Sequence, residues 1–208
     1  MTEKEKRKWN ARVYPSQAKR GIYVDLEGFK DKVPSLIGIL VENDFEQIVL
    51  DPDLEQAAIA KNLQVKSFAC AMQYIAELAK TEKRKVFAYS QHELNLALEY
   101  TSSGPTIKRK YKDGHKIAKR WFNSEHYDEH IDNWGLKGFM KFLRQPLPER
   151  FGHQKATYRL GYVRDMLAKR GTYNDLTPTA QNHWTDLLDY NEWDCLALQT
   201  LMTRVGNN

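Results

Sequence analysis

The feature that most constrains the fold is a run of three strand-like segments within residues 21–50. The first, residues 21–27, reads Gly-Ile-Tyr-Val-Asp-Leu-Glu and is rich in β-forming side chains. The second, residues 34–41, is apolar enough to be buried on both faces, and the third, residues 45–50, follows an Asn-Asp turn signal. Because the links between them are short, the three segments predict an antiparallel meander.

Beyond residue 50 the hydrophobic pattern becomes mostly helical. Residues 66–81 place apolar side chains at three- and four-residue spacing, and residues 85–89 predict a fourth short strand. Thr177 followed by Pro178 is a strong signal for the start of a helix that runs to about Arg204. Further helices are expected at residues 57–61, 91–100, 136–143 and 155–170. The pattern predicts an α/β fold with a mixed sheet, three antiparallel strands and then parallel strands, flanked by helices.

Composition limits the class of protein. The 208 residues fit one domain, for which we expect the bounds 21–205. Residues 1–20 are polar and basic, so we expect a flexible tail there, with contact to phosphates and a merely solvated terminus as the two alternatives. Cys70 and Cys195 are expected to be buried thiols. Without an apolar leader or an apolar run of membrane length, the chain is expected to be soluble and cytoplasmic, with no membrane partner.

Asp25 and Glu27 lie at the end of the first predicted strand. Residues two apart in a strand point to the same face, so both carboxylates follow the apolar Ile-Tyr-Val on a central strand. Two buried like charges are unfavourable unless a cation neutralises them, and divalent ions with oxygen ligands are the usual solution. Two solvated acids in a turn before Gly28 are the alternative, and for an isolated Asp-x-Glu that alternative is favoured.

Tyr190 and Asp194 form a second pair near the end of the chain. They are four residues apart on the predicted final helix and therefore share a face. Leucines along the same helix place Asp194 near its buried side, where an acid needs a partner. Asp186 and Asp189 are nearby alternatives, but their helical phase differs.

Together these pieces resemble the DEDD family of 3′–5′ exonucleases in the ribonuclease H-like superfamily. That family opens with Asp-x-Glu on the first strand and closes with Tyr-x-x-x-Asp on a helix, as at Asp25–Glu27 and Tyr190–Asp194. More narrowly, the chain resembles a predicted ribonuclease H-like branch of bacterial and archaeal proteins. Its closing motif is close to the Tyr-Asn-Glu-Trp-Asp-Cys-Leu-Ala of residues 190–197, and its Ser-Leu-Lys-like segment matches residues 135–137. The likeness spans residues 21–205 and is specific at its two ends.

The resemblance implies one more acid after the fourth strand. Many members have Asp there, whereas this chain offers Glu93, as does the narrower branch. His92 is expected to be a solvated neighbour. A longer Glu side chain can bind the same ion, although the geometry and the rate can differ.

The activity that the resemblance implies is metal-dependent hydrolysis of phosphodiester bonds in DNA or RNA, starting from a 3′ end. Two Mg²⁺ or Mn²⁺ ions would be held by Asp25, Glu27, Glu93 and Asp194, while Tyr190 would orient the attacking water. A nucleic-acid-binding module of the same fold that has lost catalysis, or that serves a larger repair or processing assembly, is the main alternative. A restriction-type nuclease is disfavoured because no convincing Glu-x-Lys strand follows a matching Asp.

A basic stretch at residues 108–120 is the candidate contact for the nucleic-acid backbone. The net charge of +5 and pI of about 9.0 agree with a polyanionic partner without requiring one. A solvated, partly disordered loop is the equal alternative, and Tyr111 and Trp121 either stack on bases or pack. The seven cations are Lys108, Arg109, Lys110, Lys112, Lys116, Lys119 and Arg120.

Overall fold

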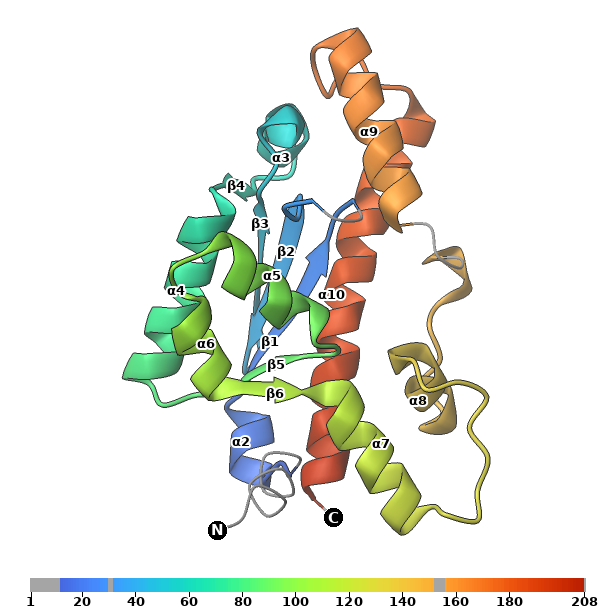
Figure 1. Ribbon diagram of the computed structural model, residues 1–208. Helices are drawn as coiled ribbons and strands as arrows, with labels where there is room; N and C mark the ends of the chain where they lie inside the picture. Colours follow the sequence, from blue (N-terminus) through green and yellow to red (C-terminus); the bar gives the residue numbers. More distant parts are fainter. Residues whose placement is uncertain (1–11, 30–31, 152–155, 208) are drawn as a thin grey trace.

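A six-stranded mixed sheet forms the centre of the molecule (Figure 1). The computed structural model describes residues 12–29, 32–151 and 156–207. The strand order is β4-β3-β2-β1-β5-β6. The bounds are Ile22–Glu27 for β1, Leu36–Val41 for β2, Asp44–Val49 for β3, Gln64–Val65 for β4, Val86–Ala88 for β5 and Tyr111–Asp113 for β6.

The direction of the strands changes at β1. Strands β1, β2 and β3 pair antiparallel, which confirms the predicted meander, while β5 runs parallel to β1 and β6 parallel to β5. The short β4 is parallel to β3. The α/β class and the mixed sheet flanked by helices are therefore confirmed. Because β1, β5 and β6 are parallel, their carboxyl ends lie at one edge of the sheet.

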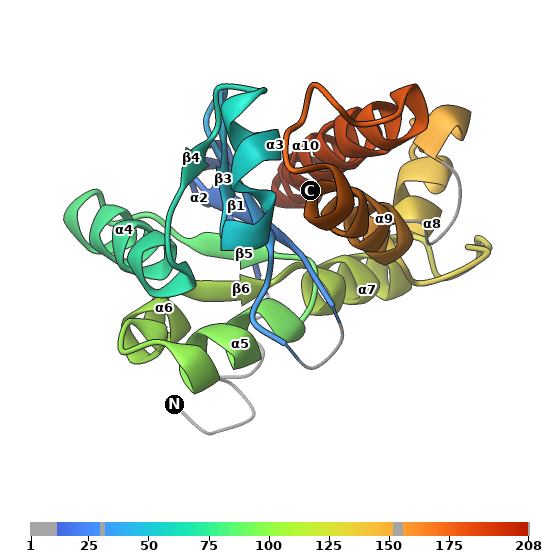
Figure 2. The same cartoon turned by 90° about the horizontal axis from the view of Figure 1, so that it is seen from above.

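Helices cover both faces of the sheet (Figures 1 and 2). One face packs against α4, Phe68–Thr81, α5, His92–Tyr100, and α6, Gly104–Lys110, through Ile22 and Val24 of β1. The other face packs against α10, Pro178–Gly206, with α7, Gly114–Glu125, and α8, Leu136–Phe142, beyond it. Side chains alternate along β1, so Tyr23 is on the α10 side.

The long helix α10 starts as the sequence predicts. Thr177 is its N-cap and accepts a hydrogen bond from the Ala180 amide at 3.3 Å, and Pro178 follows. The first half of α10 packs on α9, Ala156–Arg170, and on α3, Glu55–Ile59, which follows the 3₁₀ turn η1, Pro52–Leu54. A second 3₁₀ turn, η2, is Glu149–Phe151. The centre of α10 crosses β1 and β2, so it carries its polar residues onto the middle of the sheet.

The amino-terminal segment differs from the expectation. Residues 1–11 of the predicted tail lie outside the described residues, but Pro15–Lys19 form helix α2. Ala18 is fully buried, and the Tyr23 hydroxyl donates to its carbonyl at 2.6 Å. Helix α2 packs on the far end of α10, so a segment that is polar in sequence is ordered by partners nearly 200 residues away.

The region between residues 101 and 125 is also more ordered than a loop. It forms α6, the edge strand β6 and α7, with Ile107, Ile117 and Trp121 in the core. Of the two cysteines, Cys195 is buried as expected, whereas Cys70 is exposed on α4, so that expectation was wrong. None of the described helices has both the length and the hydropathy needed to cross a lipid bilayer.

Candidate metal centre

Strand β1 places Asp25 and Glu27 on its α10-facing side. The strand is fully buried at its start and partly buried from Asp25 to Glu27, so the acids lie where the sheet begins to meet solvent. Asp25 is opposite Gly38 of β2 and Glu27 is opposite Leu36. The period of two thus puts both carboxylates over the middle of the sheet, as the sequence predicts.

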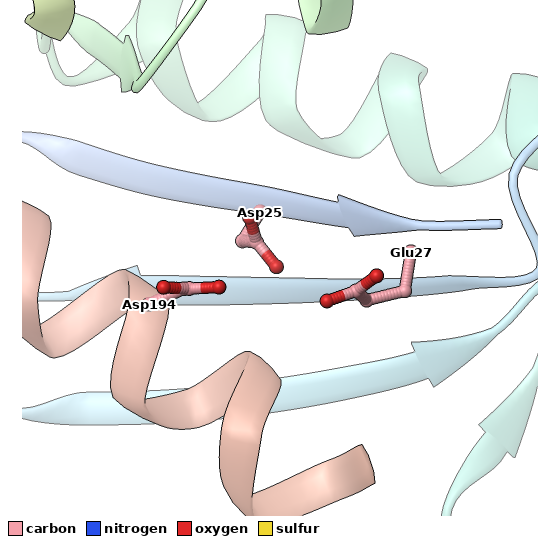
Figure 3. A group of neighbouring side chains, drawn as sticks. All are labelled: Asp25, Glu27 and Asp194. Carbon is pink, nitrogen blue, oxygen red and sulfur yellow. The ribbon is translucent and has the colours of Figure 1, made fainter. Parts of the chain in front are cut away.

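Helix α10 brings Asp194 to the same place. One carboxylate oxygen from each of Asp25, Glu27 and Asp194 lies within 4.8 Å of the other two (Figure 3). Two oxygens on opposite sides of one Mg²⁺ are about 4.2 Å apart, twice the metal–oxygen distance. The three oxygens therefore lie close enough together for side-chain rotation to bring them onto one divalent ion, and an all-carboxylate donor set suits Mg²⁺ or Mn²⁺.

Burial makes this cluster unfavourable in the charged form without a cation. Burial, with the charges of Asp194, Glu27 and Glu93 added to it, raises the pKa of Asp25 well above its usual value. Burial likewise raises the pKa of Glu27 to about 8 and that of Asp194 to about 6. Carboxylates held together against their own repulsion fit a divalent ion better than they fit solvent.

Glu93 is beside the cluster but is not a member of it. It lies in the first turn of α5, and the Ser90 hydroxyl donates to its carboxylate at 3.0 Å. Its pKa is raised, chiefly by burial, and its charge in turn raises the pKa of Asp25, Glu27 and Asp194. The group of oxygens within 4.8 Å of one another contains three acids without Glu93. His92 is exposed, as expected.

Tyr190 lies next to the metal-binding candidates. Its hydroxyl hydrogen-bonds to the Asp194 carboxylate, which lowers the pKa of Asp194, while burial raises the pKa of the tyrosine itself. The ring packs edge-on against Phe151 at a centroid distance of 5.9 Å. The hydroxyl is therefore held against the Asp194 carboxylate.

Lys137 is a site residue for which sequence reasoning assigned no role. The Nζ atom lies 4.9 Å from the centroid of the Tyr190 ring, and its charge lowers the pKa of both Glu27 and Asp194. It belongs to α8, and the only sequence signal was its match to the Ser-Leu-Lys-like segment of the resembled branch. A cation this close to the acids can neutralise an anion that enters the site.

A buried amide lies under the cluster. Asn191 of α10 is fully buried and donates from Nδ2 to Oδ2 of Asp25 at 2.7 Å. Asn191 lies within the closing motif, but no role was assigned to it from the sequence.

The alternative acids of α10 are engaged elsewhere. Asp186 accepts from the buried Arg159 at 2.9 Å, and Asp189 forms an ion pair with Arg150 at 3.0 Å. Their different helical phase directs them to α9 and η2, so the choice of Asp194 is the one that the geometry supports.

The basic stretch does not form one patch. Lys108 and Arg109 are exposed at the end of α6, while Lys116 and Lys119 are exposed on α7, and these pairs are on opposite sides of β6. Lys112 is 6% exposed and donates to the Arg12 carbonyl at 2.9 Å, and burial with the nearby Lys85 lowers its pKa to about 8. Lys112 was therefore wrongly expected at the surface, because inward-facing positions of a short edge strand are hard to recognise among lysines. Lys110 and Arg120 are half-buried.

The aromatic residues near the stretch pack into the protein. Trp121 is 5% exposed, and the Tyr111 hydroxyl donates to the Ser90 carbonyl. Trp184 is fully buried and donates from Nε1 to the Ala57 carbonyl at 3.1 Å. Trp121 and Trp184 are therefore core residues, whereas Tyr111 is partly buried with its hydroxyl bonded inside the protein.

A hollow opens directly beside Glu27. It has a volume of about 220 Å³ and is lined by apolar and basic side chains, among them Leu26, Phe29, Lys32 and His92. The walls suit a flat ring, and the two basic residues suit an anionic group. Of the clustered acids, Glu27 lines this hollow, which has room for a ligand.

Known protein families, curated proteins and solved structures offer no match to this chain. Its chemistry must therefore be inferred from the site: three converging carboxylates, a fourth beside them, and a tyrosine and a lysine at the rim. That set can bind divalent cations and, through them, a phosphate ester.

Proposed function

We propose that this protein is a metal-dependent nuclease that hydrolyses phosphodiester bonds of DNA or RNA from a 3′ end. The observation that carries the proposal is the convergence of Asp25, Glu27 and Asp194, from strand β1 and helix α10, at a partly buried point of the sheet. In this proposal the chain belongs to the tyrosine-containing DEDD exonucleases of the ribonuclease H-like superfamily, which it resembles at both end motifs.

The sheet supports the proposal independently of the motifs. The acids lie on the central strand β1, with the antiparallel β2 and β3 on one side and the parallel β5 and β6 on the other. This is the mixed sheet that the resemblance implies, with the closing helix packed across its centre. Strands β4 and β6 are short additions at the two edges.

The residues divide the work by position. Asp25, Glu27 and Asp194 would hold Mg²⁺ or Mn²⁺ ions, and Glu93 would hold a further ion or its waters from the first turn of α5. The ions would activate a water molecule and neutralise charge on the scissile phosphate. Tyr190 would orient the attacking water through its hydroxyl group, because its ring is fixed and its oxygen lies at Asp194.

Two groups would position the substrate. The Lys137 ammonium lies close to Glu27 and Asp194 and would contact an oxygen of the scissile phosphate, where charge develops during attack. The hollow beside Glu27 would receive the terminal nucleoside, with its ring against Leu26 and Phe29 and its backbone near Lys32.

A binding module of the same fold without catalysis is the second candidate, and the position of Glu93 favours it. Glu93 stays outside the group of oxygens that approach within 4.8 Å, and its carboxylate accepts from Ser90. In such a protein, nucleic acid would bind without being cleaved, within a larger repair or processing assembly.

A labelled oligonucleotide separates the two candidates. Single strands of DNA and RNA with a 5′ label are incubated with the full chain and Mg²⁺ or Mn²⁺, and a ladder that shortens from the 3′ end is expected. Asp25→Ala should abolish the ladder while retaining the melting temperature within a few degrees, and a chelator should do the same. Binding without cleavage under either metal would favour the inactive module and reject the nuclease.

A further inference from the structure

Asn191 is a fully buried polar side chain in the middle of α10. Its Nδ2 donates to Asp25 twice, to the carboxylate Oδ2 at 2.7 Å and to the backbone carbonyl at 3.2 Å. Both of these atoms are oxygens that accept hydrogen bonds. The amide nitrogen must therefore face Asp25, so its hydrogen-bond partners determine the orientation of the Asn191 amide.

Gln47 of β3 holds the other end of this amide. Its Nε2 donates to Oδ1 of Asn191 at 2.9 Å and to the Leu188 carbonyl at 3.0 Å. The donors thus point in one direction, from Gln47 to Asn191 and from Asn191 to Asp25. The bond from Gln47 fixes the orientation of the Asn191 amide, and the bond from Asn191 fixes the orientation of the Asp25 carboxylate.

Gly38 provides the space for this amide. It lies in β2 opposite Asp25 on one side and opposite Gln47 on the other. A Cβ at this position would be 2.4 Å from Oδ1 of Asn191, and its three nearest atoms would all belong to the Asn191 amide. A glycine in the middle of a buried strand is unfavourable by itself, and here its missing side chain is filled by Asn191.

We infer that Asn191 is a positioning residue that fixes the Asp25 carboxylate for metal binding, held in turn by Gln47 and admitted by Gly38. The inference rests on the proposed function, because it concerns the metal site of that function. It adds three residues from β2, β3 and α10 that touch neither the metal nor the substrate.

The physical reason is that a metal ligand must be oriented before the ion arrives. Partners of ligating carboxylates restrict their rotation, and loss of such a partner typically weakens metal binding about 10- to 100-fold. Asp25 is buried and surrounded by three other acids, so repulsion would otherwise turn its carboxylate away from Glu27 and Asp194. The bond from Asn191 of α10 opposes that rotation.

The test measures Mn²⁺ affinity of the full chain by titration calorimetry, well below the melting temperature. Asn191→Ala should weaken Mn²⁺ binding about 10- to 100-fold. Gly38→Ala should weaken it in the same direction, because the new methyl group displaces the same amide. The double variant should bind no more weakly than Asn191→Ala, since both changes act through one group.

Ser35→Ala is the matched control. Ser35 is 2% exposed, and its hydroxyl donates to Asp51 at 3.2 Å and not to an acid of the cluster. The variant loses this bond and keeps the backbone bond from the Ser35 amide to the Glu27 carbonyl. It should lower the melting temperature and leave the Mn²⁺ affinity unchanged. Should Asn191→Ala fail to fold, Gly38→Ala, which keeps the amide and suits a strand, carries the test.

The outcomes are distinct. If the unaltered protein binds no Mn²⁺, the proposed nuclease function fails. If it binds Mn²⁺ and both Asn191→Ala and Gly38→Ala bind with unchanged affinity, with or without a lower melting temperature, Asn191 is structural only and the inference is overturned.

Discussion

The acidic cluster and the basic stretch have opposite relations between sequence and space. Asp25, Glu27 and Asp194 come from the two ends of the chain and meet within 4.8 Å. The seven cations of residues 108–120 are close together in sequence, yet they are distributed over α6, β6 and α7. Charge that is dense along the chain is therefore dispersed on the surface, whereas scattered acids become one site.

The difference follows from the period of the elements. Acids two residues apart on a strand share one face of that strand, and a tyrosine and an acid four residues apart share one face of a helix. The packing of α10 on the sheet brings these two faces together. Cations that precede a short strand and cations that follow it lie at opposite ends of that strand. Lys108 in α6 and Lys116 in α7 therefore lie at opposite ends of β6. Spacing within an element predicts a site better than local charge does.

The largest expected effect is the loss of oligonucleotide cleavage in a variant of Asp194, compared with a variant of Asp189 on the same helix. Asp194→Asn should lower kcat/KM for oligonucleotide cleavage by about a thousandfold or more, because a ligand to the metal is lost. Asp189→Asn, five residues earlier on the same helix, removes an ion pair with the exposed Arg150 and should change the rate less than about twofold. Equal loss in both variants would mean that α10 matters as a helix and not through Asp194.

The second prediction concerns pH and the acids themselves. Metal binding must displace protons held on Glu27, with a pKa of about 8, and on Asp194, with a pKa of about 6, both raised chiefly by burial. Between pH 6 and 8, Mn²⁺ affinity should therefore rise about tenfold per pH unit for each proton displaced.

The same protons determine how metal-free stability changes. In this window the folded protein binds more protons than the unfolded chain, because the folded pKa values are higher. Their contribution to the free energy of unfolding is present at low pH and is lost as pH rises through 6 to 8. Thermal melts of the metal-free protein and of Glu27→Gln across this range check the sign. A Mn²⁺ affinity that does not vary with pH would contradict the cluster.

The third prediction compares two lysines of α8. Lys137→Met should lower kcat about 10-fold or more, since a charge near the developing phosphate charge is lost. Mn²⁺ affinity should stay the same or increase, because a cation that repels the metal has been removed. Lys141→Met is the control, because Lys141 is exposed and pairs with Asp132 at 2.6 Å. Weaker Mn²⁺ binding in Lys137→Met would assign the lysine to the structure of the site and not to the phosphate.

The fold was predictable where a segment identifies itself. Residues 22–49 carry three strands with a period of two or continuous apolar sequence, and Thr177 with Pro178 marks the start of α10 within one residue. Helix α2 and strand β6 were missed because each is short and polar, and each is ordered by partners distant in the chain. Local sequence cannot contain that information.

The site was predictable to the same degree. Asp25, Glu27, Asp194 and Tyr190 follow from two motifs whose periods place them on defined faces. Lys137 and Asn191 could not be assigned roles, because their partners are neighbours only after folding. Lys137 lies near Glu27 and Asp194, and Asn191 contacts Gln47 and fills the space above Gly38. Glu93, expected as a metal ligand, lies beside the group of three acids, and its role as a ligand stays a prediction.

The smallest expected effect divides the basic stretch. The carboxyl ends of β1, β5 and β6 point the same way, so Lys116 and Lys119, which follow β6, lie toward the end of the strands that carries Glu27. Lys108 and Arg109 precede β6 and lie toward the amino ends of these strands. Lys116→Gln with Lys119→Gln should weaken oligonucleotide binding a few-fold. The slope of log affinity against log salt should fall by about two, because each lost phosphate contact removes about 0.9.

Lys108→Gln with Arg109→Gln removes the same charge and should leave the slope unchanged. Net charge is matched between the two double variants, so a difference in slope reports location and not total charge. Equal slopes would mean that nucleic acid responds to the charge of the whole protein. The contrast between a converged acidic site and dispersed cations would then hold for the fold but not for binding.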